Sequence, residues 1–136
     1  MNREIKFRGK RIDNGNWVYG DLIHDDLDFD LPGVSIRFNY KEEFRYSIKD
    51  VIPETVGEYT GLKDKKQKDI YEGDLVRTYV PEEGKLLERI IYENGSFRVN
   101  CLSGDKIDYP LGSILSKYIE VVGNIYQNPE LLEEAK

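Results

Sequence analysis

Apolar and polar residues alternate along most of this chain with a period of two, which is the pattern of a half-buried β-strand. Clusters of Gly, Asn, Asp and Pro separate the alternating segments, as expected where tight turns join strands. The pattern therefore predicts a mainly β protein in which no helix longer than two turns is required. Strands are predicted at residues 4–8, 17–19, 34–38, 75–80, 86–92, 97–101, 119–122 and 125–126.

Two short loops predict hairpins between neighbouring strands. Asn94-Gly95 is the stronger signal, because both central residues of a type I′ turn need positive φ. A two-residue turn there places Tyr92 opposite Phe97. The turn cluster at residues 13–16 predicts a second hairpin between the first two strands.

The other predicted elements are arranged around residues 59–76. This segment has a charged loop at residues 64–68 with one turn on either side of it. We predict an all-β fold in which residues 1–56 form an N-terminal β subdomain. This subdomain packs on a small SH3-like β-barrel formed by residues 57–136, and Pro129 begins a short C-terminal helix. The predicted core of the barrel is Leu62, Ile70, Leu75, Val76, Ile91, Phe97, Val99, Val121 and Ile125.

Charge and cysteine content narrow the function classes. The 136 residues carry a net charge of −6, which argues against a generic nucleic-acid coat. A single cysteine, Cys101, excludes an internal disulfide and is predicted at a buried strand position. No apolar run approaches the roughly 20 residues of a membrane span, so we expect a cytoplasmic protein. Basic residues nevertheless gather in two places, at residues 3–11 and 63–68.

Candidate catalytic and metal sites are weak. Asp26, Asp28 and Asp30 resemble the start of a calcium loop, but Leu31 and Arg37 stand where a Gly and a Glu are needed. His24 and the adjacent Asp25 do not form a catalytic dyad, because the side chains of neighbouring residues on a strand point to opposite faces. One more group of residues is a candidate for acid–base catalysis: Glu54, Thr55, Tyr71, Glu72 and Asp74. This group is predicted to form the hydrogen bonds of turns instead. We therefore predict no enzyme activity and no catalytic, cofactor-binding or metal-binding residues.

Several motifs together resemble the YopX family, small proteins encoded by phages and prophages of Gram-positive bacteria. They are REIKFRGK, WVYGDL, VIPETVGEYTGLKDKKQKDIYEGDLV, YENGSF and IEVVGNIYQNPELL, and they span nearly the whole chain. The resemblance implies an all-β fold and the cytoplasm of a bacterial host, and it carries over no catalytic residues. The chain departs from the family pattern at Gln67, where the loop usually has Gly, and at Gly9-Lys10, where an Ala-Trp pair is usual.

Two functions of different class follow. The first is an accessory module that binds a protein partner or itself, with a homo-oligomer expected through the N-terminal strand around Ile5 and Phe7; Tyr and Arg are enriched in interface cores. The second is a weak nucleic-acid-binding accessory protein that uses the basic N-terminal strand and the lysine loop. The candidate interaction residues are Ile5, Phe7, Arg8, Lys10, Arg11, Trp17, Tyr59, Lys65, Lys66, Tyr71 and Asp74.

Overall fold

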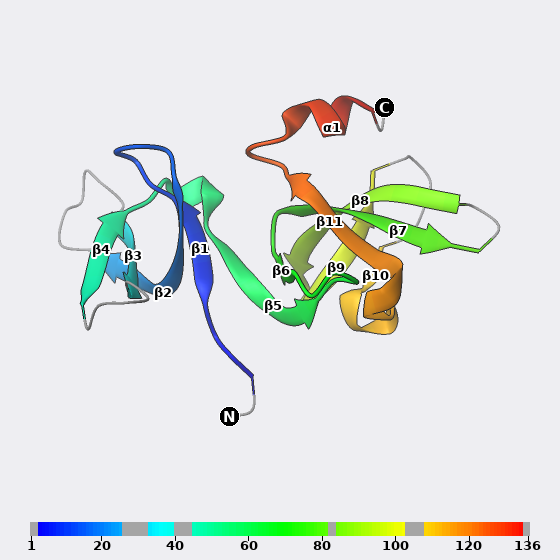
Figure 1. Ribbon diagram of the computed structural model, residues 1–136, viewed down its shortest axis with the longest axis horizontal. Helices are drawn as coiled ribbons and strands as arrows, with labels where there is room; N and C mark the ends of the chain where they lie inside the picture. Colours follow the sequence, from blue (N-terminus) through cyan, green and yellow to red (C-terminus); the bar gives the residue numbers. More distant parts are fainter. Residues whose placement is uncertain (1–2, 26–32, 40–44, 82–83, 103–107, 135–136) are drawn as a thin grey trace. The chain divides into compact units, whose positions relative to one another are not determined.

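The computed structural model describes residues 3–25, 33–39, 45–81, 84–102 and 108–134 (Figure 1). The chain divides into two compact units, residues 1–59 and residues 60–136, and the predicted boundary after residue 56 lies just before the strand in which they divide. Among the described residues, no helix is long and apolar enough to cross a membrane.

The first unit is an antiparallel sheet with the strand order β4-β3-β2-β1-β5. The predicted turn at residues 13–16 joins β1 and β2, which pair as a hairpin. A 3-10 turn, η1, precedes β5, whose second half continues into the second unit and pairs there with β6. The elements are β1 (Phe7–Lys10), β2 (Trp17–Asp25), β3 (Gly33–Asn39), β4 (Tyr46–Asp50), η1 (Pro53–Thr55) and β5 (Gly57–Lys63).

One face of this sheet holds the core of the first unit. Its buried centre consists of Val18, Val34, Ile36 and Val51, and partly buried apolar side chains pack around it. The strands approach each other so closely that a Cβ on Gly20 would lie 2.0 Å from the carbonyl oxygen of Arg37. A residue without a side chain is therefore required where β2 passes β3.

The second unit is built on a five-stranded antiparallel sheet with the order β10-β9-β8-β7-β11. Two 3-10 turns, η2 and η3, precede β11, and the predicted C-terminal helix is present as α1. The elements are β6 (Asp69–Tyr71), β7 (Asp74–Val80), β8 (Gly84–Glu93), β9 (Ser96–Cys101), β10 (Tyr109–Pro110), η2 (Leu111–Ser113), η3 (Ser116–Tyr118), β11 (Ile119–Asn124) and α1 (Pro129–Glu134).

The all-β class is confirmed, but the predicted SH3-like barrel does not close in the part of the chain that the structure describes. The five-stranded sheet is open there, with β10 and β11 at its edges, because β6 pairs with β5 instead of joining this sheet. The predicted hairpin is confirmed: Tyr92 pairs with Phe97, and Asn94 and Gly95 have φ values of 53° and 78°. Cys101, predicted to be buried, is only half-buried at the end of β9.

The predicted core of the second unit is correct at five of its nine positions. Leu62 was wrong: it is 37% exposed, because Gly61 with a φ of 86° interrupts the alternation along β5. Ile91 is only partly buried, since the pairing of Ile90 with Val99 turns Ile90 inward instead. Phe97 and Ile125 are likewise partly buried. The buried cluster is Ile70, Val76, Ile90, Val99, Leu111, Ile119 and Val121, and Leu75 is also fully buried.

Candidate interaction surface

The sheet of the first unit has a second face, opposite its core, that we call the outer face. Residues paired directly across antiparallel strands share a face, and side chains two apart on a strand share it too. The pairs Arg8 with Tyr19, Lys10 with Trp17, Asp21 with Arg37, Arg37 with Ile48 and Asn39 with Tyr46 therefore all lie on the outer face. This face is rich in the residue types that dominate protein interfaces.

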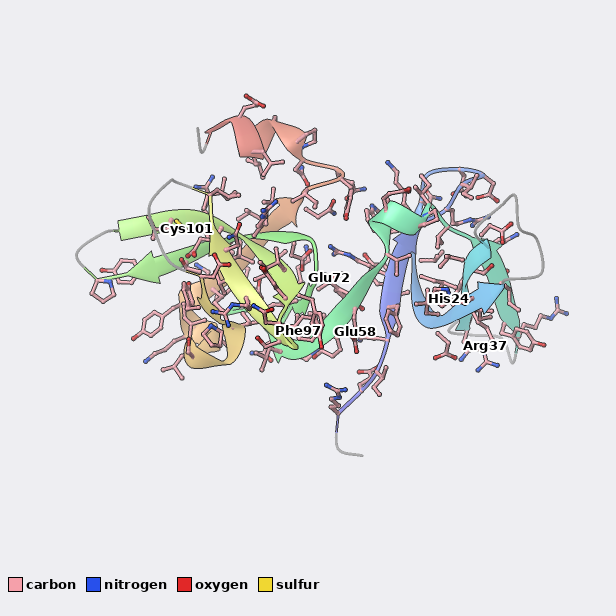
Figure 2. All side chains as sticks on the ribbon, turned by 180° about the vertical axis from the view of Figure 1, so that it is seen from behind. His24, Arg37, Glu58, Glu72, Phe97 and Cys101 are labelled. Carbon is pink, nitrogen blue, oxygen red and sulfur yellow. The ribbon has the colours of Figure 1, made fainter. Side chains whose placement is uncertain are left out.

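Arginine side chains contact the aromatic rings of the outer face. Arg37, on β3 (Figure 2), donates a hydrogen bond of 3.0 Å to Asp21, and its guanidinium lies 5.4 Å from the ring centre of Tyr46. Arg8 is buried, and its guanidinium lies 5.1 Å from the ring centre of Trp17. Such cation–π contacts hold the rings in place while leaving ring surface exposed.

Large apolar side chains on this face are open to solvent. Tyr19 is 50% exposed, Tyr46 is 63% exposed and Ile48 is 49% exposed. A hollow of about 320 Å³ lies beside Ile48 and is also lined by Ile12, which is 63% exposed. The remaining lining comes from Asp13, Lys49 and Asp50, so the hollow has two apolar residues and both signs of charge.

Strand β4 forms one edge of the sheet. It pairs with β3 on one side, and among the described residues no strand pairs along its other side. In the described part of the chain, the contacts along that side lie at the end of β4, where the N–H of Ile12 donates to the carbonyl of Asp50 at 3.1 Å and Arg11 forms a bridge with Val51. The stretch from Tyr46 to Lys49 thus combines a sheet edge with two exposed apolar side chains.

The N-terminal strand, expected to form the contact of a homo-oligomer, lies inside the sheet of its own unit. β1 pairs with β2 on one side and with β5 on the other, and Phe7 packs against the core. The register of β1 with β2 is that of the hairpin predicted from the turn at residues 13–16. Ile5, just before β1, remains 43% exposed.

The basic residues at the N-terminus contact their own unit. The Lys6 ammonium lies 3.5 Å from Glu4 and 4.7 Å from the ring centre of Tyr59, and Arg11 makes two hydrogen bonds to Asp13. Their charges are therefore partly balanced locally, which a count of basic residues along the sequence did not show.

Four of the predicted interaction residues, Arg8, Tyr59, Tyr71 and Asp74, are buried, so their side chains offer little surface to a partner. The carboxylate of Asp74 accepts a 2.8 Å hydrogen bond from the N–H of Tyr71, which confirms the predicted turn chemistry. Thr55, from the same candidate set, belongs to the first unit, where its hydroxyl donates to the carbonyl of Ile52 at 2.6 Å. The set is thus divided between two units.

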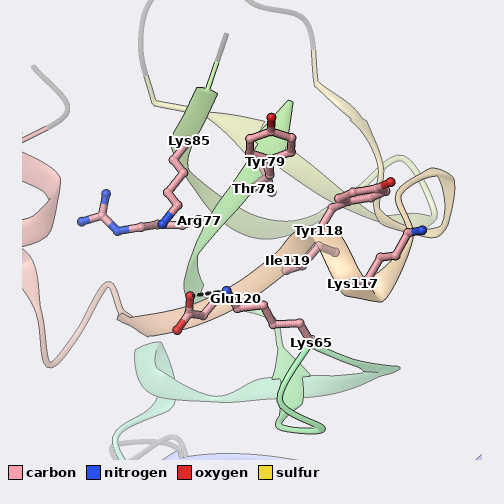
Figure 3. A pocket seen from close by; sticks show the side chains of 9 residues that line it. All are labelled: Lys65, Arg77, Thr78, Tyr79, Lys85, Lys117, Tyr118, Ile119 and Glu120. Carbon is pink, nitrogen blue, oxygen red and sulfur yellow. Dashed lines mark ion pairs between the residues drawn. The ribbon is translucent and has the colours of Figure 1, made fainter. Parts of the chain in front are cut away.

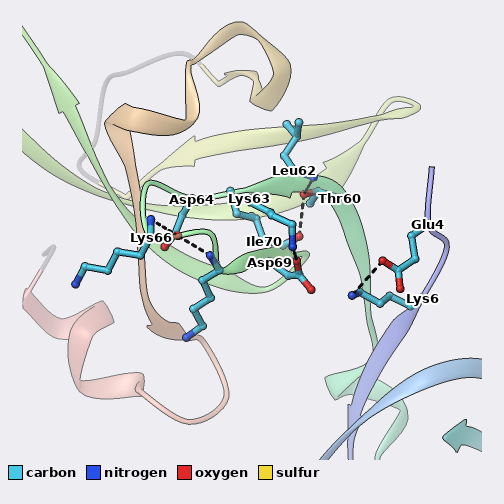
Figure 4. Close-up of polar contacts among 10 residues, drawn as sticks. Glu4, Lys6, Thr60, Leu62, Lys63, Asp64, Lys66, Asp69 and Ile70 are labelled. Atoms are coloured by element: carbon cyan, nitrogen blue, oxygen red, sulfur yellow. Dashed lines mark hydrogen bonds and ion pairs between the residues drawn. The ribbon is translucent and has the colours of Figure 1, made fainter. Parts of the chain in front are cut away.

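The lysine loop of the second unit is held by an acid within it. The buried Asp64 carboxylate accepts hydrogen bonds from the N–H groups of Lys66 and Lys68, at 2.8 and 2.9 Å (Figure 4). Lys66 and Lys65 extend outward to Glu120, at 2.8 and 3.1 Å. Their hydrogen bonds hold the pKa of Glu120 at about 2, far below its usual range.

A buried acid in the second unit was missed by the sequence analysis. Glu88 occupies an inward position on β8 and accepts hydrogen bonds from the hydroxyls of Thr78 and Tyr109. Burial raises the pKa of the Glu88 carboxyl, and burial is also the main cause of the raised pKa of Tyr109. The sequence signal that could have found Glu88 is a charged residue at a position where the alternation along the strand places a side chain toward the core. Because Glu88 is only 1% exposed, we assign this cluster to the core.

The remaining candidates add no site. The acidic run at residues 26–30 lies outside the described residues. His24 is exposed on β2, and the residues that the structure describes contain no group of three His, Cys, Asp or Glu side chains placed to hold a metal ion.

Comparisons with known proteins identify the family and the fold. The family model described as YopX protein matches residues 6–133. The crystal structure of protein EF1440 from Enterococcus faecalis superposes with a TM-score of 0.59 at 21% sequence identity, covering 96% of this chain and 99% of that chain. At this identity the likeness shows the fold alone. A search of curated proteins gave no significant match.

Proposed function

The chain belongs to the YopX family, and from that premise we propose that it is a phage- or prophage-encoded accessory protein of the bacterial cytoplasm that self-associates. The contact is the β4 edge with the adjoining outer face of the first unit, and the partner is a second copy of the chain. In this role the protein acts as a binding module and not as an enzyme.

The observation that carries the proposal is the exposure of Tyr46 and Ile48 on a sheet edge along which none of the described strands pairs. An edge strand offers a row of backbone N–H and C=O groups to another strand. Natural proteins usually protect such an edge, whereas here two large apolar side chains, 63% and 49% exposed, lie along it. Tyr and Arg are typical of the centres of protein interfaces, and Arg37 stacks on Tyr46 at this position.

A second copy suits this surface because the surface is self-complementary. Two copies of β4 related by a two-fold axis run antiparallel, so that each residue that contacts a partner residue is contacted in return. Asp21 and Arg37 give the outer face both signs of charge, so the face does not repel its own copy. The hollow lined by Ile12 and Ile48 together with charges of both signs offers each copy a mixed apolar and charged site for a side chain of the other.

The test is the molar mass in solution, measured by light scattering after size-exclusion chromatography. The intact chain, 15.9 kDa as a monomer, is expected to show twice that mass at micromolar concentrations. The double variant Tyr46→Glu, Ile48→Glu is expected to be a folded monomer, because four buried carboxylates would repel in the dimer contact.

Leu115→Glu is the matched control, because Leu115 is 62% exposed but belongs to the second unit. It should leave the dimer intact. A monomeric intact chain over the whole concentration range contradicts self-association, and a dimer that persists in the Tyr46, Ile48 variant contradicts the β4 edge as the contact. Removing residues 1–11 is not a useful test, since β1 lies between β2 and β5 and its loss would disrupt the sheet.

A further inference from the structure

Four cationic side chains from separate segments meet around one small hollow of the second unit (Figure 3). We call this hollow and its rim the basic surface. Its lining contains one acid, Glu120, in a chain whose net charge is −6. Its cationic and aromatic residues are Lys65, Arg77, Lys85, Lys117, Tyr79 and Tyr118.

The strand register explains why these residues share a surface. Tyr79 on β7 pairs with Lys85 on β8, and Arg77 on β7 pairs with Glu120 on β11. Arg77 and Tyr79 are two apart on one strand, so their side chains leave the same face of the sheet. The lysine loop joins them because the N–H of Lys65 donates to the carbonyl of Ile119 at 2.9 Å.

Two exposed tyrosines lie within this cationic surface. The rings of Tyr79 and Tyr118 are stacked, with centres 6.4 Å apart and an angle of 26° between their planes. Tyr79 is 53% exposed and Tyr118 is 37% exposed, so ring surface remains available to a ligand. The Lys117 ammonium lies 5.1 Å from the ring centre of Tyr118, which places a positive charge beside the aromatic surface.

The size of the hollow indicates what kind of ligand fits. Its volume is about 40 Å³, whereas sites that enclose a small molecule have volumes of roughly 300 Å³ or more. A ligand must therefore lie across the surface. A chain of phosphates with flat, unpaired bases matches both the cations and the exposed tyrosines of this surface. The phosphates pair with the cations, and a base stacks on an exposed ring.

We propose that the basic surface binds single-stranded nucleic acid without sequence preference. Lys65, Arg77, Lys85 and Lys117 contact phosphates, and a base stacks on Tyr118 or Tyr79. Glu120 opposes binding, because its carboxylate is paired with Lys65 and Lys66 and adds a negative charge to the rim. A bound phosphate competes with Glu120 for these lysines, which makes the affinity modest.

The experiment is fluorescence anisotropy of labelled oligo(dT) and oligo(U) with the intact chain at low ionic strength. The two oligonucleotides distinguish DNA from RNA as the source of the ligand. Four phosphate contacts on a single strand predict a slope of about −3 for log K against log salt. A duplex of equal length is expected to bind more weakly, since its paired bases cannot stack on tyrosine.

Some variants of the basic surface should weaken nucleic-acid binding, and one should strengthen it. Arg77→Glu with Lys117→Glu should abolish binding, and Tyr118→Ala should weaken it roughly tenfold through lost stacking. Glu120→Gln should strengthen binding, a gain that a damaged fold would not give. Arg3→Glu with Lys6→Glu is the control, because it makes the same change of charge in the first unit and should leave binding unchanged.

Several outcomes would overturn the proposal. They are the absence of salt-dependent binding to either oligonucleotide, and loss of binding in the Arg3, Lys6 control while the Arg77, Lys117 variant still binds. Equal binding of a poly-glutamate peptide that is insensitive to Tyr118→Ala would identify an acidic protein segment as the ligand instead. A circular-dichroism melt of each variant shows that the fold is retained.

Discussion

The carboxylate of Asp64 accepts a 2.9 Å hydrogen bond from the backbone N–H of Val121, 57 residues further along the chain. Its other oxygen accepts two hydrogen bonds from backbone N–H groups of its own loop, those of Lys66 and Lys68. One buried acid therefore closes the lysine loop and attaches it to β11, and the loop's position beside the basic surface depends on this link.

Replacing Asp64 should destabilise the protein substantially. In Asp64→Asn an amide NH2 replaces one carboxylate oxygen, so at least one buried backbone N–H loses its acceptor. We expect a loss of about 2–3 kcal/mol in the free energy of unfolding, measured by urea denaturation. Asp69→Asn is the control: Asp69 at the start of β6 forms an ion pair with Lys63 at the end of β5, and loss of this pair should cost less than about 1 kcal/mol. Equal effects would contradict the role given to Asp64.

Gln67 adopts a conformation that favours glycine, with a φ of 66°. Gln67→Gly should therefore raise the free energy of unfolding, by about 1 kcal/mol, because the left-handed conformation costs other residues about that much or more. Gln67→Ala is the control, since alanine keeps a Cβ and should leave the stability nearly unchanged. If both variants behave alike in urea denaturation, the backbone strain at this position is negligible.

Local patterns in the sequence predicted much of the fold. The alternation and the Asn94-Gly95 signal act over a few residues. They correctly predicted the β8–β9 hairpin and located seven of the strands, although β1 begins at Phe7 instead of residue 4, β2 continues to Asp25, and residues 125–126 form a turn. They could not decide which of Ile90 and Ile91 faces the core, because both are apolar and only the pairing with β9 distinguishes them. Closure of the predicted barrel also depends on long-range pairing, which alternation does not report.

The candidate surfaces were harder to predict, for the same physical reason. Tyr46 and Arg37 share a face only because β3 and β4 pair in one particular register. Asp64 lies among lysines in the sequence, which is typical of a solvated loop, yet the structure buries it. Tyr71 and Asp74 were assigned to a surface on residue type alone, and burial excludes them.

A substitution at Gly95 tests the hairpin turn, because its effect on stability does not include a change in side-chain packing. Its φ is 78°, and a Cβ built there has no neighbour within 4 Å, so a substitution meets only backbone strain. Gly95→Val should lower the free energy of unfolding by about 1–3 kcal/mol. Gly95→Asn should cost less, because Asn tolerates positive φ. An unchanged urea midpoint for the valine variant would contradict the turn.

The buried carboxyl of Glu88 should make stability depend on pH. Burial raises its pKa above the ordinary value of 4.5, so the folded state favours the neutral acid. The contribution of this neutral form is fully present below pH 4.5 and is lost as the pH rises through the folded-state pKa.

Glu88→Gln should remove this dependence. Glutamine stays neutral, and its oxygen can still accept the hydrogen bonds that Thr78 and Tyr109 donate to Glu88. The variant should therefore gain stability relative to the wild type as the pH rises from 4.5 to neutrality, measured by urea denaturation at several pH values. Glu93→Gln, an exposed change on the same strand, should show no such trend. A stability difference between Glu88→Gln and the wild type that stays constant with pH would mean that Glu88 does not titrate above its ordinary range in the folded protein.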